Sequence, residues 1–100
     1  HWIFEGTNLV EGDLIGSDGL NKGGASGWET DKITNHSPKN IVHLAKGTNP
    51  NGGGADMIYY ENEFGGQVFS VGSITYTGSL SVDENISQIT RNVFDRFLNE

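Results

Sequence analysis

The chain has 100 residues, with 13 acidic and 6 basic side chains, a formal net charge of −7 and no cysteine. The acidic excess argues against binding to nucleic acid or to anionic membrane surfaces, because both require a basic face. The absence of cysteine excludes disulfides and thiolate metal sites. It is compatible with the cytoplasm, where we expect the protein to reside, but does not exclude secretion.

The length predicts one domain, or part of one, over residues 1–100. The chain opens on the apolar run Trp2-Ile3-Phe4 without an initiator methionine, and we expect it to be the closing part of a larger polypeptide. Glycine makes up 15 of the 100 residues, about twice the usual ~7%. Much of the chain is therefore expected to be turns and loops.

The N-terminal third carries one strand prediction and one long connection. Trp2, Ile3 and Phe4 are bulky, strand-favouring residues, so residues 1–5 are predicted to form a short strand. Residues 16–27 are polar and rich in glycine, which predicts a long loop, and such loops are usually functional or mobile.

Three apolar runs in the middle of the chain predict strands at 41–46, 55–61 and 68–71. The last two are separated by a loop of hairpin length and are predicted to pair over residues 55–71. Both faces of 55–61 carry apolar side chains, which favours burial between two layers.

The C-terminal residues 81–98 follow the helical repeat. Ser81 is predicted to be the N-cap, with Glu84 three residues later completing a capping box. The predicted apolar stripe consists of Ile86, Ile89, Val93 and Phe97, widened by Phe94 and Leu98. The fold class expected from these elements is α+β: a small, mainly antiparallel sheet with one helix across it.

The acidic segment at 28–31 is one candidate binding site. Glu29 and Asp31 are two positions apart, so on a strand they would share a face and could bind a cation or orient a ligand beside Trp28. The alternative is a strand edge with solvated acids. Asp56 and the asparagines before it match no calcium-loop spacing and are interpreted as turn residues.

His43 lies in an apolar strand and is either a half-buried structural histidine or a site residue. Ser73, Thr75 and Tyr76 follow the strand at 68–71, where ligands often bind in α/β sheets. Alternatively, their hydroxyls satisfy nearby backbone groups. No catalytic residue and no metal ligand is assigned on spacing, since the sequence has no His-x-x-x-His or Gly-x-Ser-x-Gly pattern.

Several short motifs, in this order and spacing, resemble the C-terminal segment of the N,N-dimethylformamidase large (beta) subunit and its relatives. The resemblance extends over essentially the whole chain. The motifs are His1-Trp2-Ile3-Phe4-Glu5-Gly6-Thr7, Ser26-Gly27-Trp28-Glu29-Thr30-Asp31, Leu44-Ala45-Lys46-Gly47, Ala55-Asp56-Met57-Ile58-Tyr59-Tyr60, Gly66-Gln67-Val68-Phe69-Ser70-Val71-Gly72-Ser73-Ile74 and Ile89-Thr90-Arg91-Asn92-Val93-Phe94-Asp95-Arg96-Phe97.

The resemblance implies the final strands and last helix of a glutamine-amidotransferase-like α/β domain in an enzyme that hydrolyses an N-substituted formamide. It also implies a metal ion held by tyrosines and a carboxylate. The family's metal motif, of the His-Pro-Glu-Tyr-Trp type, lies upstream and does not occur in this sequence. No cofactor is therefore expected in this chain, and Tyr59, Tyr60 and Tyr76 are not assigned as ligands.

The leading functional hypothesis is a non-catalytic, structural C-terminal part of such an amide hydrolase, lending polar residues to its cleft. The expected partner is the remainder of the parent chain or a second copy of this chain, with a small amide as substrate. The alternative is a stand-alone module that binds carbohydrate or peptide, with Trp2 and Trp28 on its contact face.

Overall fold

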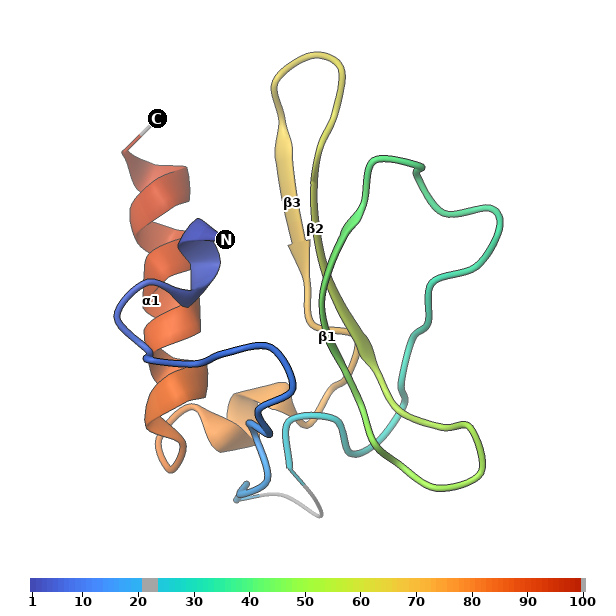
Figure 1. Cartoon of the computed structure of the whole chain (residues 1–100), viewed down its shortest axis with the longest axis vertical. Helices are drawn as coiled ribbons and strands as arrows, with labels where there is room; N and C mark the ends of the chain where they lie inside the picture. The colour runs from blue at the N-terminus through green and yellow to red at the C-terminus, as the bar shows by residue number, and fades with distance from the viewer. Residues whose placement is uncertain (21–23, 100) are drawn as a thin grey trace. The chain divides into compact units, whose positions relative to one another are not determined.

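The computed structural model describes residues 1–20 and 24–99 (Figure 1). The fold class is α+β, as predicted: the described residues form a three-stranded antiparallel sheet, two 3₁₀ turns and one α-helix. The chain divides into two compact units, of which one joins His1–Ala25 to Thr75–Glu100 and the other is Ser26–Ile74. The two units are described separately below.

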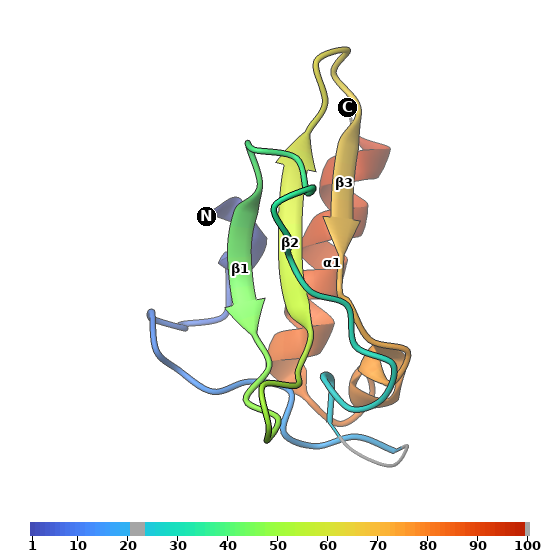
Figure 2. The same cartoon turned by 90° about the vertical axis from the view of Figure 1, so that its right-hand side faces the viewer.

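The unit Ser26–Ile74 contains the whole sheet, whose strands lie in the order β1-β2-β3 (Figure 2). Each strand agrees with its predicted range to within one residue at either end, and the predicted hairpin over 55–71 is confirmed as the β2–β3 pair. The strands are β1 (Val42–Lys46), β2 (Asp56–Glu61) and β3 (Gln67–Ser70).

The tip of the β2–β3 hairpin is closed by Asn62. Its side-chain Oδ1 accepts hydrogen bonds from the backbone N–H groups of Phe64 and Gly66, at 3.0 and 2.8 Å. An asparagine that bonds its own turn in this way sets the direction in which the chain reverses. The register that follows pairs Tyr59 with Phe69 and Ile58 with Ser70.

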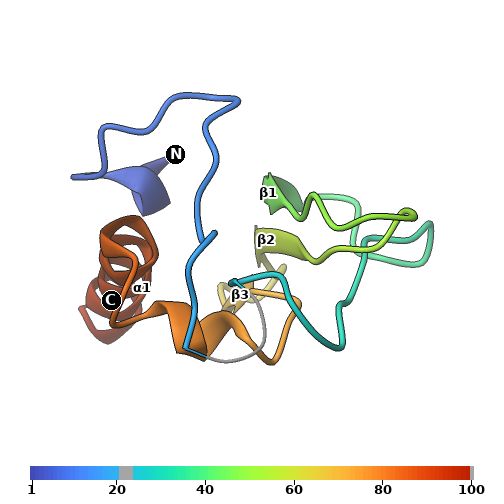
Figure 3. The same ribbon diagram turned by 90° about the horizontal axis from the view of Figure 1, so that it is seen from below.

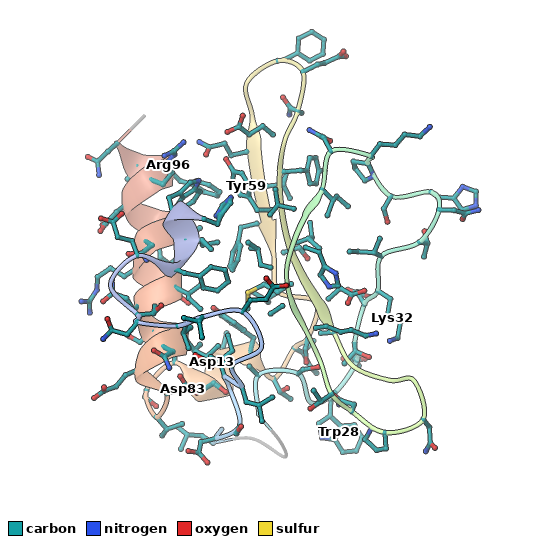
Figure 4. All side chains as sticks on the ribbon, in the orientation of Figure 1. Asp13, Trp28, Lys32, Tyr59, Asp83 and Arg96 are labelled. Atoms are coloured by element: carbon teal, nitrogen blue, oxygen red, sulfur yellow. The ribbon has the colours of Figure 1, made fainter. Side chains whose placement is uncertain are left out.

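The central strand β2 is buried on both faces. Asp56 and Ile58 lie on one face, Met57 and Tyr59 lie on the other, and all four are buried. Residues 31–40 pass across the Asp56 face of the sheet without forming a strand of their own (Figures 1 and 3). Lys32 Nζ, labelled in Figure 4, donates a hydrogen bond to the Gly53 carbonyl at 3.2 Å and so ties this segment to the β1–β2 turn.

The other unit is built on helix α1 (Glu84–Leu98), whose buried stripe is Ile86, Ile89 and Val93. The predicted stripe was too wide, because Phe94 and Leu98 are 60% and 79% exposed. At about 100° per residue these two side chains lie roughly a quarter to a third of a turn away from Ile86. Among the described residues, the buried face of α1 is therefore narrower than the apolar stripe predicted from the sequence.

Asp83, not Ser81, is the N-cap of α1, so the predicted capping box is wrong. Asp83 Oδ1 accepts from the Ile86 backbone N–H at 3.0 Å, and Oδ2 accepts from the buried Gly16 N–H at 2.8 Å (Figure 4). One carboxylate thus caps the helix and fixes a distant loop. Ser81 instead lies in a turn, in which the Val82 and Asp83 N–H groups donate to the Ser79 carbonyl, so the helix starts two residues later than predicted.

Residues 1–5 were predicted to be a strand but contain the 3₁₀ turn η1 (Trp2–Phe4). The turn buries Ile3 completely. Asn92 on α1 donates from Nδ2 to the carbonyl oxygens of Ile3 and Glu5, at 2.9 and 2.7 Å, so acceptors that a strand partner would use are already occupied. Arg96 lies 4.8 Å from the ring of Trp2 in a cation–π contact.

A second 3₁₀ turn, η2 (Tyr76–Ser79), was not predicted and holds part of the glycine-rich connection. The buried Ser79 hydroxyl donates to the Asp18 carbonyl at 2.6 Å, and the Leu20 N–H donates to the Gly78 carbonyl at 2.9 Å. Residues 21–23 of the predicted 16–27 loop lie outside the described residues. Over the described ranges, no helix has both the length and the apolar character needed to cross a bilayer.

The cap assignment predicts that Asp83→Ala lowers the free energy of unfolding by roughly 2–3 kcal/mol, because it removes a cap and leaves the buried Gly16 N–H without its acceptor. Ser81→Ala is the matched control and should change stability by less than about 0.5 kcal/mol. Urea denaturation followed by far-UV circular dichroism measures both. A larger loss for Ser81→Ala than for Asp83→Ala would contradict the assignment.

Candidate functional site

The described residues bring one histidine and one carboxylate into direct contact, in the sheet-containing unit. His43 Nε2 on β1 lies 2.9 Å from Asp56 Oδ1 on β2. The His43 side chain is 42% exposed, whereas the Asp56 side chain is only 10% exposed. An ionised carboxylate can only accept, so the imidazole donates its Nε2–H to Asp56.

Asp56 makes two hydrogen bonds with the segment that crosses the sheet. Its other oxygen, Oδ2, accepts from the Ile33 backbone N–H at 2.8 Å. Its own N–H donates to the Asp31 carbonyl at 2.9 Å, and the Asp31 N–H donates to the Gly72 carbonyl at 2.7 Å. Gly72 has φ of 69°, and a side chain there would lie 2.9 Å from the Asp56 carbonyl oxygen. With Oδ2 bonded to the Ile33 N–H, Oδ1 is the oxygen that contacts His43.

A β-bulge in β1 puts His43 on the face that carries Asp56. The register pairs His43 with Ile58 and Ala45 with Met57, so Leu44 is the extra residue between them. In a regular strand, His43 and Ala45 would point the same way; across the bulge they lie opposite residues on different faces of β2. Because Ile58 and Asp56 share a face, the bulge brings the imidazole within reach of the carboxylate.

The segment Trp28–Asp31 is not a strand, so Glu29 and Asp31 do not share a strand face as predicted. Glu29 has φ of 48°, in the left-handed region, which breaks the alternation between them. Both carboxylates are exposed, and Trp28 is 56% exposed (Figure 4). Asp31 is placed by its backbone bonds next to Asp56.

Ser73 lies beside Trp28 through its hydroxyl. Ser73 Oγ accepts from the Gly27 N–H at 3.2 Å and donates to the Trp28 carbonyl at 2.8 Å. This hydroxyl fixes the backbone on which Trp28 stands. The structure thus brings Ser73 and Trp28 together, and Asp31 and His43 around Asp56, within one unit.

Thr75 and Tyr76 belong to the other unit, and their hydroxyls have partners there. Thr75 Oγ1 donates to the Gly24 carbonyl at 2.8 Å. The buried Tyr76 hydroxyl lies 2.8 Å from Thr90 Oγ1 on α1. Burial raises the pKa of Tyr76 above its usual value, an effect that the Thr90 hydrogen bond opposes and the charge of Asp83 reinforces.

Asp56 and Ser26 are the site residues that sequence reasoning missed. Asp56 was interpreted as a turn residue, but it is the first residue of the buried strand β2. The available signal was a charged side chain opening the apolar run Met57-Ile58-Tyr59, since a buried carboxylate needs partners. Ser26 Oγ accepts from the Ala55 N–H at 2.7 Å and donates to Asn49 Oδ1 at 3.0 Å.

No trio of histidine, aspartate and glutamate side chains gathers in a way that could hold a metal ion within residues 1–20 and 24–99. The His43–Asp56 pair has a single imidazole and a carboxylate whose two oxygens are already engaged. It therefore does not fit a resident metal by itself.

The chain has an α+β fold, and its sheet carries a histidine held by a carboxylate. Both features are compatible with the part of an amide hydrolase that the sequence motifs indicate. A family model described as N,N-dimethylformamidase beta subunit-like, C-terminal, matches residues 1–91. The chain belongs to this family.

Two relatives are both named N,N-dimethylformamidase beta subunit. The N,N-dimethylformamidase beta subunit of Paracoccus aminophilus is 33% identical over 127 aligned positions, and that of an Alcaligenes species is 32% identical over the same length. Each alignment includes 99% of this chain and 16% of the relative. The chain therefore spans about a sixth of the length of these relatives, which also contain residues that it lacks within the aligned region.

The raised pKa of Tyr76 predicts a pH dependence of stability. Because the folded pKa exceeds the unfolded value of about 10, the contribution of Tyr76 is complete below pH ~10 and is lost as pH rises through the folded pKa. The free energy of unfolding, measured by urea denaturation from pH 8 to pH 11, should fall at the alkaline end. Tyr76→Phe should flatten this fall, at a cost of about 1 kcal/mol at pH 8 for the lost hydrogen bond.

Tyr60→Phe is the control, since Tyr60 lies on β2 and is only partly buried. It should leave the alkaline fall in place. An alkaline fall of the same size in Tyr76→Phe and in the unsubstituted chain would show that another group is responsible.

Proposed function

We propose that this chain is the C-terminal structural part of a larger amide hydrolase of the N,N-dimethylformamidase kind, and that it does not hydrolyse amides by itself. The observation that carries the proposal is the match of nearly the whole chain to one sixth of two N,N-dimethylformamidase beta subunits. The remainder of the parent polypeptide is then its partner, with a second copy of this chain as the alternative. A cytoplasmic location is part of the same proposal.

Most candidates for the proposed contribution to the substrate cleft are polar groups of the sheet-containing unit. Trp28, Glu29 and Asp31 have exposed side chains, and Ser73 holds the Trp28 backbone in place. Thr75 and Tyr76 remain candidates, with hydroxyls engaged in bonds of the other unit. The metal ion that the resemblance implies is proposed to be held by residues of the parent protein outside this chain.

The experiment compares the product of the complete natural open reading frame with the 100-residue chain, using N,N-dimethylformamide as substrate and formate release as the readout. The complete product should hydrolyse the amide and the short chain should not. Formate release by the short chain alone would show that the chemistry lies within these residues.

The cleft role makes a second prediction in the complete protein. Glu29→Gln together with Asp31→Asn should raise KM roughly threefold to tenfold, since each tenfold corresponds to about 1.4 kcal/mol of binding, and should leave the melting temperature unchanged. Glu63→Gln, at the exposed tip of the β2–β3 hairpin, is the matched control. Unchanged KM in the double variant would remove these carboxylates from the cleft.

The exposed Trp28 favours one other function, a stand-alone module that stacks a carbohydrate or peptide on its indole. A natural open reading frame no longer than this chain, together with quenching of Trp28 fluorescence by such a ligand, would support the module over the hydrolase part.

A further inference from the structure

We propose that His43, oriented by Asp56, is a proton-transfer residue that this chain supplies to the amide hydrolase. This inference rests on the proposed function and goes beyond its structural role. It assigns the His43–Asp56 pair to the hydrolytic step, with a small N-substituted amide as the class of substrate.

The two ring nitrogens of His43 are in different situations. Nε2 is bonded to Asp56 Oδ1 at 2.9 Å, and the carboxylate fixes the hydrogen on this nitrogen. In the neutral ring, Nδ1 is then the acceptor. Within the described residues, Nδ1 has no hydrogen-bond partner, and the side chain is 42% exposed. A fixed acceptor nitrogen open to the surroundings is the arrangement that a general base requires.

The surroundings of Asp56 are built for orientation. Oδ2 is held by the Ile33 N–H, and the backbone of Asp56 is bonded to Asp31, so the carboxylate cannot turn away from the imidazole. A histidine held by a carboxylate whose second oxygen is itself anchored keeps one tautomer and one ring orientation. The β-bulge at Leu44 also directs His43 toward Asp56, and bulges often turn a side chain in this way beside a functional site.

Stability alone does not account for the pair. A hydrogen bond from an exposed imidazole to a carboxylate contributes roughly 1–3 kcal/mol at most, and apolar residues of similar size often replace a partly buried polar pair without loss. The fold nonetheless places a carboxylate at the start of its most buried strand, anchors its second oxygen on the Ile33 N–H, and bonds the Asp56 backbone N–H to the Asp31 carbonyl. Such an arrangement suits a group that must hold another in position.

The step balances without any further reactant. His43 Nδ1 takes a proton from water as the water oxygen bonds to the amide carbon. The same proton passes to the amine nitrogen as the carbon–nitrogen bond breaks, which returns the ring to its neutral form. Amine and carboxylic acid are released, and the acid gives its proton to solvent. The Nε2–H stays bonded to Asp56 throughout.

The test uses the complete natural protein. His43→Gln keeps an N–H donor close to the position of Nε2 and so can keep the bond to Asp56, but it lacks a nitrogen that can accept a proton. It should reduce kcat by roughly 100-fold to 10,000-fold, the usual contribution of general acid–base catalysis, with KM and melting temperature nearly unchanged. His36→Gln is the matched control, because His36 is an exposed loop histidine in the same unit.

Chemical rescue separates a proton-transfer role from a structural one. In His43→Ala, added imidazole should restore part of kcat, whereas a protein that has only lost a contact would gain nothing from it. A kcat of His43→Gln within about threefold of the unsubstituted protein, or an inactive but folded His43→Ala that imidazole does not rescue, would overturn the inference while leaving the proposed function intact. A complete protein that hydrolyses no amide would instead overturn the proposed function, and the inference with it.

Discussion

The unit Ser26–Ile74 depends on the point where the chain enters β2, at Ala55 and Asp56. The backbone N–H groups of Ala55 and Asp56 lie at the buried start of the strand and donate to Ser26 Oγ and to the Asp31 carbonyl. Each would cost roughly 1–3 kcal/mol if left without a partner away from water. The segment 26–33 supplies both acceptors, and Asp56 binds the same segment in return through Ile33. Close approach is possible because Gly47 has no side chain: a Cβ there would lie 2.7 Å from the Ala55 nitrogen.

In the other unit, polar side chains also hydrogen-bond the backbone of segments that are distant in the sequence. Asp83 joins the start of α1 to Gly16, and Asn92 joins the middle of α1 to the carbonyl groups of η1. A chain with only 34% hydrophobic residues has little apolar surface with which to fix its loops. Short polar side chains with two or more hydrogen-bonding atoms therefore fix them, and each such side chain joins segments that are far apart in sequence.

This arrangement explains which elements the sequence could reveal. The strands β1, β2 and β3 were predictable because their signals are local: apolar runs bounded by glycine, asparagine and proline. The start of α1 was not predictable in the same way. Ser81 and Asp83 are both good caps, and the choice between them depends on Gly16, which lies 67 positions earlier. The N-terminal turn was missed for a similar reason, since its carbonyl groups are taken by Asn92.

The candidate site also depends on a contact that local sequence patterns do not reveal. His43 and Asp56 are 13 positions apart, and period-two alternation alone does not place them on one face; the bulge at Leu44 does. Among the polar candidates, Ser73, Thr75 and Tyr76 bond to groups within their own unit, so their hydroxyls already contribute to the fold. His43 differs because its fold contact engages one ring nitrogen and leaves the other turned away from that contact. A side chain that is held at one end and open at the other can act on something that the chain itself does not contain, and this makes His43 the group through which a structural part could take part in chemistry.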